Sequence, residues 1–121
     1  MNKSIFAAIP SQYRLNDEEA DTLRARINAL VRKAEAGLGV ECYLIADIAS
    51  YFTDKNFREK GYNNSHEAMS AFLEDAINLI CEADFSVFPF GWETSRECRI
   101  LHKVSNECGI VSLAFKEDLL P

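Results

Sequence analysis

The side chains best suited to chemistry lie in one short stretch that begins at Gly91, just after the apolar run at residues 85–90. Trp92 offers a flat aromatic surface, and Ser95 a hydroxyl near the start of a predicted helix. An aromatic ring can stack on a base, and a helix N-terminus can hold an anion or a sugar hydroxyl. Open α/β sheets bind ligands where a strand ends before a helix, so these residues predict a ligand site.

Three other residues are candidates for the same site. Tyr13 and Arg14 follow the first predicted strand, and in a parallel sheet their loop lies at the same edge as Trp92. The guanidinium of Arg14 suits a phosphate or a carboxylate. Asp84 stands where an apolar helix meets the strand at residues 85–90. The simpler interpretations are an exposed arginine, a turn aspartate and a tryptophan that closes the core, and the residues alone leave these open.

The four cysteines contain no CxxC pair, and we interpret them as buried thiols in a reducing compartment. Cys98 and His102 have the i, i+4 spacing that can share a metal, but no further ligands stand at a supporting spacing. The chain also lacks P-loop, GxSxG and HExxH motifs. We therefore expect neither a metal site nor a bound cofactor.

The 121-residue chain carries a net charge of −6. Proteins that bind a nucleic-acid backbone are usually basic, so this charge disfavours a nucleic-acid partner but leaves room for a small anionic ligand. No segment is long and apolar enough to span a bilayer, and the N-terminal residues lack the apolar core of a signal peptide. We expect a cytoplasmic protein with no membrane partner.

Local patterns predict alternating strands and helices that would position these side chains. Short apolar runs predict buried strands at residues 5–9, 41–46, 85–90 and 110–115. Capping boxes predict three helices and pair Asn16 with Glu19, Asn64 with Glu67, and Thr94 with Glu97, while helix ends are predicted at Gly37, Gly39 and Gly109. Part of residues 48–57 is also predicted to be helical. This order predicts a single domain over residues 1–121, an α/β three-layer flavodoxin-like fold with a short parallel sheet of about four to five strands.

The sequence also resembles a known family, at its first strand and over roughly residues 67–115. Residues 5–10 read IFAAIP where the family has I-Y-x-A-G-P, and Ala83-Asp84, Gly91-Trp92 and Ser95 follow in the family's order. On these residues the chain resembles the short phage and bacterial branch of the nucleoside 2-deoxyribosyltransferase-like superfamily. The resemblance implies a nucleoside or nucleotide ligand, N-glycosidic-bond chemistry, and a homo-oligomer in which a neighbour completes the pocket. Any of the aromatic residues Tyr51, Phe52, Phe57 and Tyr62 that are exposed would then suit the interface.

Three positions depart from the family pattern. Ile9 replaces a glycine of the first loop, Glu97 replaces a glycine near the helix start, and Leu101 occupies the position of the nucleophilic glutamate. Leucine cannot attack an anomeric carbon, so catalysis by the family route is altered or lost. Glu97 lies one turn before Leu101 on the same helix face and could supply a carboxylate from there. The alternative, which the pattern favours, is that Glu97 only completes the capping box of Thr94.

Three functions remain open. The chain could hydrolyse or transfer N-glycosidic bonds with Glu97 as a replacement nucleophile. It could instead bind a nucleotide or a nucleotide-derived signal without catalysis, or keep the fold as an interaction protein without a pocket. The lost glycines and nucleophile argue against the first function, and the retained Gly91, Trp92 and Ser95 argue against the third. We expect a protein that binds a nucleoside or nucleotide, and whether it is an enzyme stays open.

Overall fold

A computed structural model describes residues 2–116 of the chain. Its centre is a four-stranded sheet in the order β2-β1-β3-β4. The strands are β1 (Lys3–Ala7), β2 (Cys42–Leu44), β3 (Phe85–Phe88) and β4 (Val111–Ala114). Every pairing is parallel, with Lys3 opposite Cys42, Ile5 opposite Phe85, and Phe85 opposite Val111. The predicted parallel sheet is confirmed, although β1 begins before the predicted run and the other strands end earlier than predicted.

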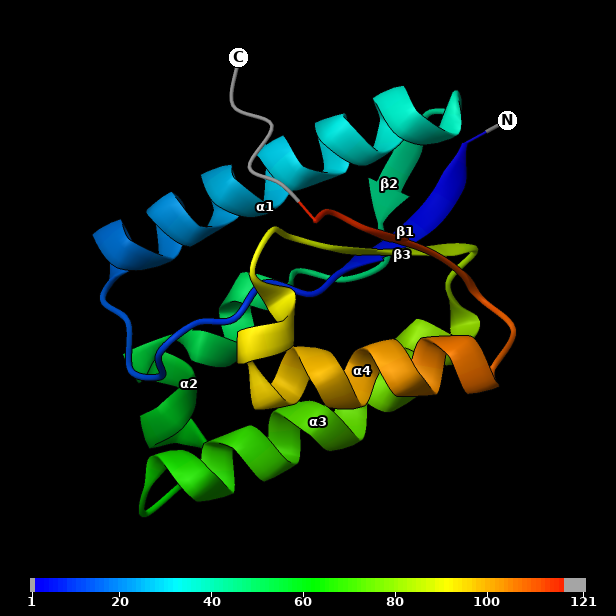
Figure 1. The fold of residues 1–121 in the computed structure, drawn as a ribbon. Coiled ribbons are helices and arrows are strands. Elements are labelled where there is room, and N and C mark those ends of the chain that lie inside the picture. The colour runs from blue at the N-terminus through cyan, green and yellow to red at the C-terminus, as the bar shows by residue number, and fades with distance from the viewer. Residues whose placement is uncertain (1, 117–121) are drawn as a thin grey trace.

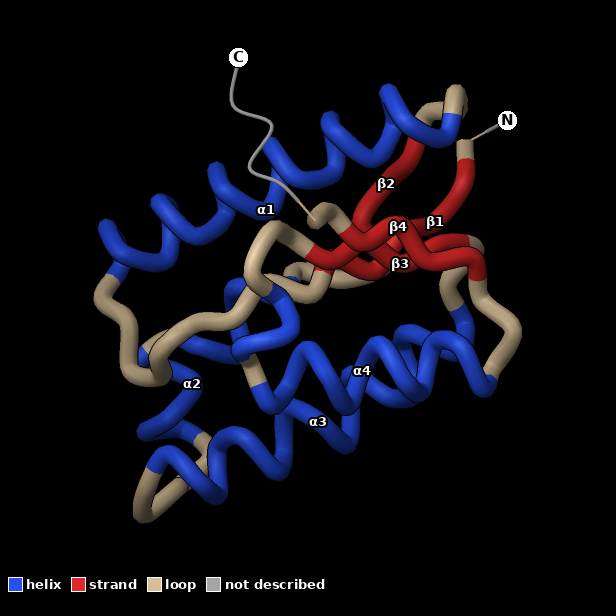
Figure 2. Tube along the Cα trace, viewed as in Figure 1, coloured by secondary structure: helices blue, strands red, loops and turns tan. Residues whose placement is uncertain are grey.

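Helices cover both faces of this sheet (Figure 1, Figure 2). On one face lies α1 (Asp17–Leu38), and on the other lie α3 (Ser65–Glu82) and α4 (Arg96–Glu107) side by side. The shorter helical segments are η1 (Ile48–Phe52), α2 (Asp54–Glu59) and η2 (Trp92–Thr94). The fold is therefore the predicted α/β three-layer arrangement, and the prediction of helix within residues 48–57 is confirmed as well.

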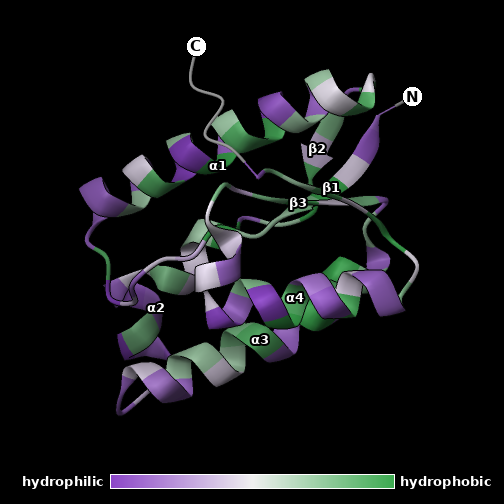
Figure 3. Ribbon diagram, viewed as in Figure 1, coloured by the Kyte–Doolittle hydropathy of each residue, from purple (hydrophilic) through white to green (hydrophobic). Residues whose placement is uncertain are grey.

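The core lies against the two central strands, which are apolar because helices pack on both of their faces. Ile5, Phe6 and Val87 are completely buried. Figure 3 shows hydrophobic colouring along the strands, with hydrophilic and hydrophobic turns alternating on α1 and α4. One polar cluster interrupts the apolar core, because the hydroxyls of Ser86 and Ser105 are buried and lie 2.7 Å apart where α4 packs on β3.

Two of the predicted helix ends are formed as the sequence indicates. At the start of α1, the Asn16 side chain accepts from the Glu19 N–H at 2.8 Å, and the Glu19 carboxylate accepts from the Asn16 N–H at 3.0 Å. Gly39 ends the same helix in the left-handed region, with φ 71°. At α3 the capping box is only half formed, because Asn64 caps the Glu67 N–H while the Glu67 carboxylate accepts from the Asn63 N–H.

The start of α4 differs from the prediction, because Ser95 and not Thr94 is its N-cap. Ser95 has extended backbone angles, and its hydroxyl accepts from the Cys98 N–H at 3.3 Å. Thr94 belongs to η2, and its hydroxyl donates to the Gly91 carbonyl at 2.7 Å. Serine and threonine are both good caps, so residue types could not separate two neighbouring positions. The turn that begins at Gly91 decides between them.

The four aromatic residues considered for an interface are buried or partly buried, so Phe52 and Phe57 are not available to a partner. Phe52 and Phe57 are buried, with 3% and 7% of their surfaces exposed. Tyr51 and Phe52 both pack on Phe72 of α3, with ring centroids 5.5 Å and 5.0 Å away, and Phe57 packs on Tyr62. These residues join η1 and α2 to α3, because a segment with few regular hydrogen bonds needs apolar contacts to hold its place.

The interpretation of all four cysteines as buried thiols is also wrong. Cys42 and Cys98 are buried free thiols, but Cys81 and Cys108 form a disulfide with a Cα–Cα distance of 5.8 Å. Both bonded residues are exposed and stand where α3 and α4 end. Because the two helices lie side by side, their ends bring together cysteines that are 27 residues apart in the sequence.

Candidate ligand-binding site

The chain connections identify one edge of the sheet as the natural place for a ligand. β1 lies between β2 and β3, so the connections that follow β1 and β3 leave toward opposite sides of the sheet. In open α/β sheets, ligands bind at the carboxyl ends of the strands beside such a switch point. The segments at this edge are the loop at residues 8–15 after β1 and residues 89–95 after β3. The candidate site is built from these two segments and the start of α4.

A small closed pocket lies at this edge. It measures about 10 Å³, which is room for one water molecule. Its lining residues are Ala8, Ile9, Pro10, Ser11, Phe52, Phe72, Glu97, Cys98 and Leu101. Glu97 is the charged group in this wall, while Leu101, at the family's nucleophile position, is a buried apolar wall residue.

The Tyr13 side chain packs beside this pocket and carries a polar group without a partner. Its ring lies on Phe52, with centroids 5.0 Å apart. Its hydroxyl is buried and has no hydrogen-bond partner in the part of the chain that the structure describes. Burial raises the pKa of Tyr13, and electrostatic interactions with Glu97 and Tyr62 add to the rise. Tyr13 therefore stays protonated near pH 7 and can donate a hydrogen bond.

The Glu97 carboxylate is held by Ser95. The Ser95 hydroxyl donates to Glu97 Oε2 at 3.0 Å while it also accepts from the Cys98 N–H. The predicted capping box with Thr94 is absent, so Glu97 does not reach back to a backbone N–H as that prediction required. Ser95 was predicted to bind a ligand, yet the residue is only 9% exposed and its hydroxyl bonds within the protein. Its role here is to position Glu97 and to cap α4.

Cys98 lines the closed pocket, which the sequence did not predict. Its thiol lies 3.4 Å from the Ala8 carbonyl and joins α4 to the first loop. Burial raises the pKa of Cys98 to about 11, Ser95 lowers it, and the charge of Glu97 raises it. The thiol therefore stays neutral near pH 7. The i, i+4 partner His102 points elsewhere, because its ring stacks on Trp92 with centroids 4.2 Å apart.

In this conformation Trp92 packs against the core, and Gly91 allows a tight turn of the backbone. The indole packs on His102 and on Phe88, with its centroid 5.7 Å from the Phe88 ring, and it does not line the closed pocket. Gly91 has φ 81°, a conformation that other residues rarely adopt, and a Cβ there would meet no atom within 4 Å. Gly91 is needed for the turn rather than for the close approach of another group.

Arg14 and Asp84 are not brought to the pocket. The Arg14 Nε donates to Asp54 at 2.8 Å, and its guanidinium lies 4.8 Å from the centre of the Phe57 ring. Asp84 stands before β3, so it lies at the opposite edge of the sheet, where it accepts from the Ser4 N–H at 2.9 Å. A four-residue strand, roughly 13 Å long, separates Asp84 from the candidate site.

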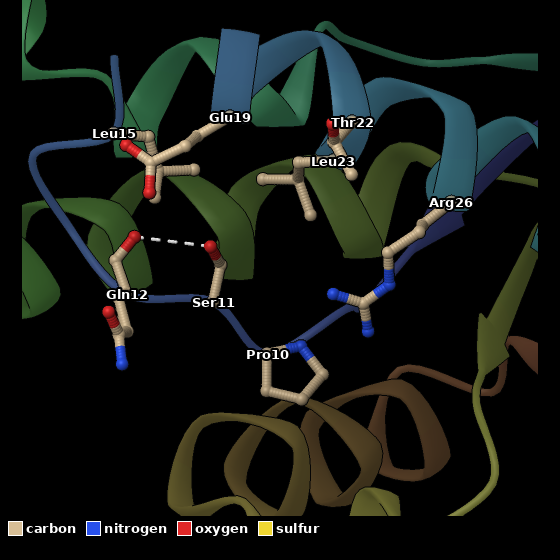
Figure 4. A pocket seen from close by; sticks show the side chains of 8 residues that line it. All are labelled: Pro10, Ser11, Gln12, Leu15, Glu19, Thr22, Leu23 and Arg26. Carbon is tan, nitrogen blue, oxygen red and sulfur yellow. Dashed lines mark hydrogen bonds between the residues drawn. The ribbon is translucent and has the colours of Figure 1, made fainter.

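An open groove lies on the other side of the first loop, between that loop and α1 (Figure 4). Its volume is about 540 Å³, which is within the usual size of small-molecule sites. Its lining residues are Pro10, Ser11, Gln12, Leu15, Glu19, Thr22, Leu23 and Arg26. Pro10 and Ser11 line both cavities, so the groove and the closed pocket are neighbours. No sequence pattern pointed to Arg26, which has the spacing of an ordinary exposed helix residue.

Within residues 2–116, no helix is both long and apolar enough to cross a membrane, and no three side chains of the types His, Cys, Asp or Glu are grouped to hold a metal. No protein-family model matches the chain, and no curated protein matches it.

Proposed function

We propose that this protein binds a small ligand of the nucleoside or nucleotide class at the carboxyl ends of β1 and β3. The observation that carries the proposal is the buried, unpartnered hydroxyl of Tyr13, whose ring packs on Phe52 in the wall of the closed pocket. A buried hydroxyl without a partner costs about 1–3 kcal/mol, so it is rarely kept without a use. Ligand binding supplies the missing partner.

The chemistry of the pair fits a nucleoside. Tyr13 is a donor and Glu97 an acceptor, and sugar hydroxyls and base edges carry both kinds of group. The nearby walls, Phe52 and Phe72, are apolar and aromatic and fit the faces of a base. The resemblance at the first strand and over roughly residues 67–115 implies the same ligand class.

Entry of the ligand requires a shift of the first loop, because the closed pocket has room for only about one water molecule. The loop is suited to such a shift. It is anchored where the Ala8 N–H donates to Val87 and the Leu15 N–H donates to Phe52, at 3.0 Å and 2.8 Å. Between these anchors, residues 9–14 make no backbone hydrogen bond to any part of the chain that the structure describes. Few bonds therefore break when the loop opens toward the groove.

An enzymatic form of the proposal rests on Glu97. Because Ser95 caps α4, Glu97 is free of the capping role and lines the pocket. Its carboxylate would attack the anomeric carbon, the C–N bond would break, and the base would leave with the bonding electrons and take up a proton. Water would then hydrolyse the glycosyl ester, release the sugar and restore the carboxylate.

The test is equilibrium dialysis against a panel of nucleosides and nucleotides, with both sides analysed by chromatography. We expect one class to be retained, and new free-base peaks would identify the enzymatic form. Glu97→Gln should weaken retention about tenfold, as the loss of one charged hydrogen bond predicts, and should abolish any base release. Glu93→Gln is the matched control, because Glu93 is exposed on the neighbouring turn. The proposal fails if the panel is neither retained nor cleaved.

A further inference from the structure

We propose that the groove between α1 and the first loop is a phosphate subsite, so that the preferred ligand is a nucleoside monophosphate. This inference rests on the proposed function, because it assigns the part of the ligand that lies outside the closed pocket. The groove and the pocket share Pro10 and Ser11 in their walls. A ligand whose base or sugar reaches Tyr13 and Glu97 therefore has its other end beside the groove.

The first step of the argument is the state of Arg26. The other arginines of α1 are paired: Arg24 with Asp21 and Asp47, and Arg32 with Glu35. Arg26 is exposed and forms no hydrogen bond or ion pair within residues 2–116. In Figure 4 its side chain extends from α1 toward the loop at Pro10. The free guanidinium of Arg26 can bind a phosphate in the groove with two parallel hydrogen bonds.

The second step is the supply of donors in the groove. The side chains of Ser11 and Thr22 already donate to backbone carbonyls, those of Gln12 and Glu18, at 3.1 Å each. Among the described lining residues, Arg26 and the side-chain amide of Gln12 therefore remain free to donate into the groove, and Arg26 is the charged one of the two. The backbone N–H groups of residues 11 and 12 also lack an acceptor among residues 2–116 and can add to its hydrogen bonds.

The charge of the groove limits the number of phosphates. Arg26 is the positive residue in the lining and Glu19 is the negative one. Glu19 stays in place because its carboxylate accepts from the Asn16 N–H at the start of α1. With no second lysine or arginine in that lining and a net charge of −6 on the chain, each added phosphate meets repulsion that nothing offsets. One phosphate is thus favoured over two or three.

The experiment measures affinity by calorimetry for a nucleoside retained in dialysis, its 5′-monophosphate and its triphosphate. We expect the monophosphate to bind most tightly. Arg26→Gln should weaken the monophosphate about tenfold or more and leave the nucleoside unchanged, because the lost bonds are charge-assisted. Lys103→Gln is the control, because it removes the same charge from an exposed position on α4, across the sheet from α1.

The results separate this inference from the proposed function. Tight binding of the nucleoside with no gain from the phosphate, or equal weakening of both ligands by Arg26→Gln, would overturn the subsite and leave the proposed function standing. If no nucleoside or nucleotide binds, the proposed function fails. Inorganic phosphate alone, followed by phosphorus NMR line broadening, then decides on the subsite. Broadening that Arg26→Gln removes would support it, and broadening that is absent or unchanged in the variant would reject it.

Discussion

At the scale of single residues, one polar pair stands out from an otherwise satisfied interior. Tyr13 has the single buried side-chain polar atom without a hydrogen-bond partner in residues 2–116. The Glu97 carboxylate, which contributes to the raised pKa of Tyr13, is itself held by the Ser95 hydroxyl at 3.0 Å. The Glu97 carboxylate is thus held in place, while the Tyr13 hydroxyl has no partner among the described residues. This arrangement is expected of a preorganised ligand site.

Removal of the Tyr13 hydroxyl should have opposite effects on stability and binding. We expect Tyr13→Phe to raise the free energy of unfolding by about 1 kcal/mol, because a buried group that bonds to nothing is lost. Affinity for the retained nucleoside should fall about tenfold, which corresponds to one hydrogen bond. Urea unfolding and calorimetry measure the two quantities. Tyr43→Phe, at a residue that is 53% exposed on β2, should change neither. A Tyr13 variant that loses stability would show that the hydroxyl has a partner.

At the scale of elements, side chains tie the two central strands, β1 and β3, to their neighbours at both ends. Asp84 accepts from the N–H and the hydroxyl of Ser4, at 2.9 Å and 3.2 Å, and so ties the start of β3 to the start of β1. At the opposite ends the Cys98 thiol bonds the Ala8 carbonyl and ties α4 to the first loop. Hydrogen bonds between elements that are distant in the sequence thus tie both ends of the central strands.

The tie at Asp84 predicts how stability depends on pH. The Ser4 N–H lowers the pKa of Asp84, burial opposes this, and the Ser4 hydroxyl and Lys3 lower it further. Because the folded pKa lies below the unfolded value of about 3.9, this stabilisation is present above that pH and is lost as the pH falls through the folded pKa. Asp84→Asn should therefore lower the urea midpoint at pH 6 and matter less near pH 2.5.

The matched control for this pH dependence is Glu74→Gln, because Glu74 is an exposed carboxylate on α3 with no hydrogen bond in the described chain. Its substitution should leave the urea midpoint nearly unchanged at both pH values. An Asp84→Asn effect that stays constant from pH 6 to pH 2.5 would contradict the assignment, since a group already protonated has no charge left to lose.

At the scale of the whole molecule, the disulfide between Cys81 and Cys108 encloses half of the candidate site. The loop that it closes contains β3, η2 and α4, and therefore Glu97, Ser95 and Cys98. The other half of the site, the loop after β1, lies outside it. The disulfide holds the ends of α3 and α4 together. These two helices contribute Phe72 and Leu101 to the wall of the closed pocket.

Reduction of this disulfide should lower the free energy of unfolding by about 3–4 kcal/mol, because the unfolded chain regains the freedom of the 27-residue loop. Urea unfolding with and without reductant measures the loss, and the double variant Cys81→Ser/Cys108→Ser should reproduce it. Mass spectrometry after alkylation gives a second readout. The folded protein should take up no label when oxidised and two labels when reduced, because Cys42 and Cys98 are buried. Ready labelling of Cys81 and Cys108 without reductant would contradict the cross-link.

The sequence by itself determined the order and type of the regular elements and, through them, the parallel α/β fold. Apolar runs, caps such as Asn16 and terminating glycines such as Gly39 are local signals, because a helix or a short buried strand is specified largely by its own residues. The local patterns also selected the edge of the sheet, since β1 and β3 must both end there. The ligand class, the homo-oligomer and the cytoplasmic location stay predictions.

Only the tertiary structure decided which side chains meet at that edge. The turn at Gly91 placed the cap of α4 at Ser95 and released Glu97 from Thr94, and the packing of η1 on α3 turned Phe52 inward. The contact of Tyr13 with Phe52 and the disulfide between Cys81 and Cys108 join residues far apart in the chain. Neither pair leaves a local pattern, because such contacts depend on how whole helices and loops pack against the sheet.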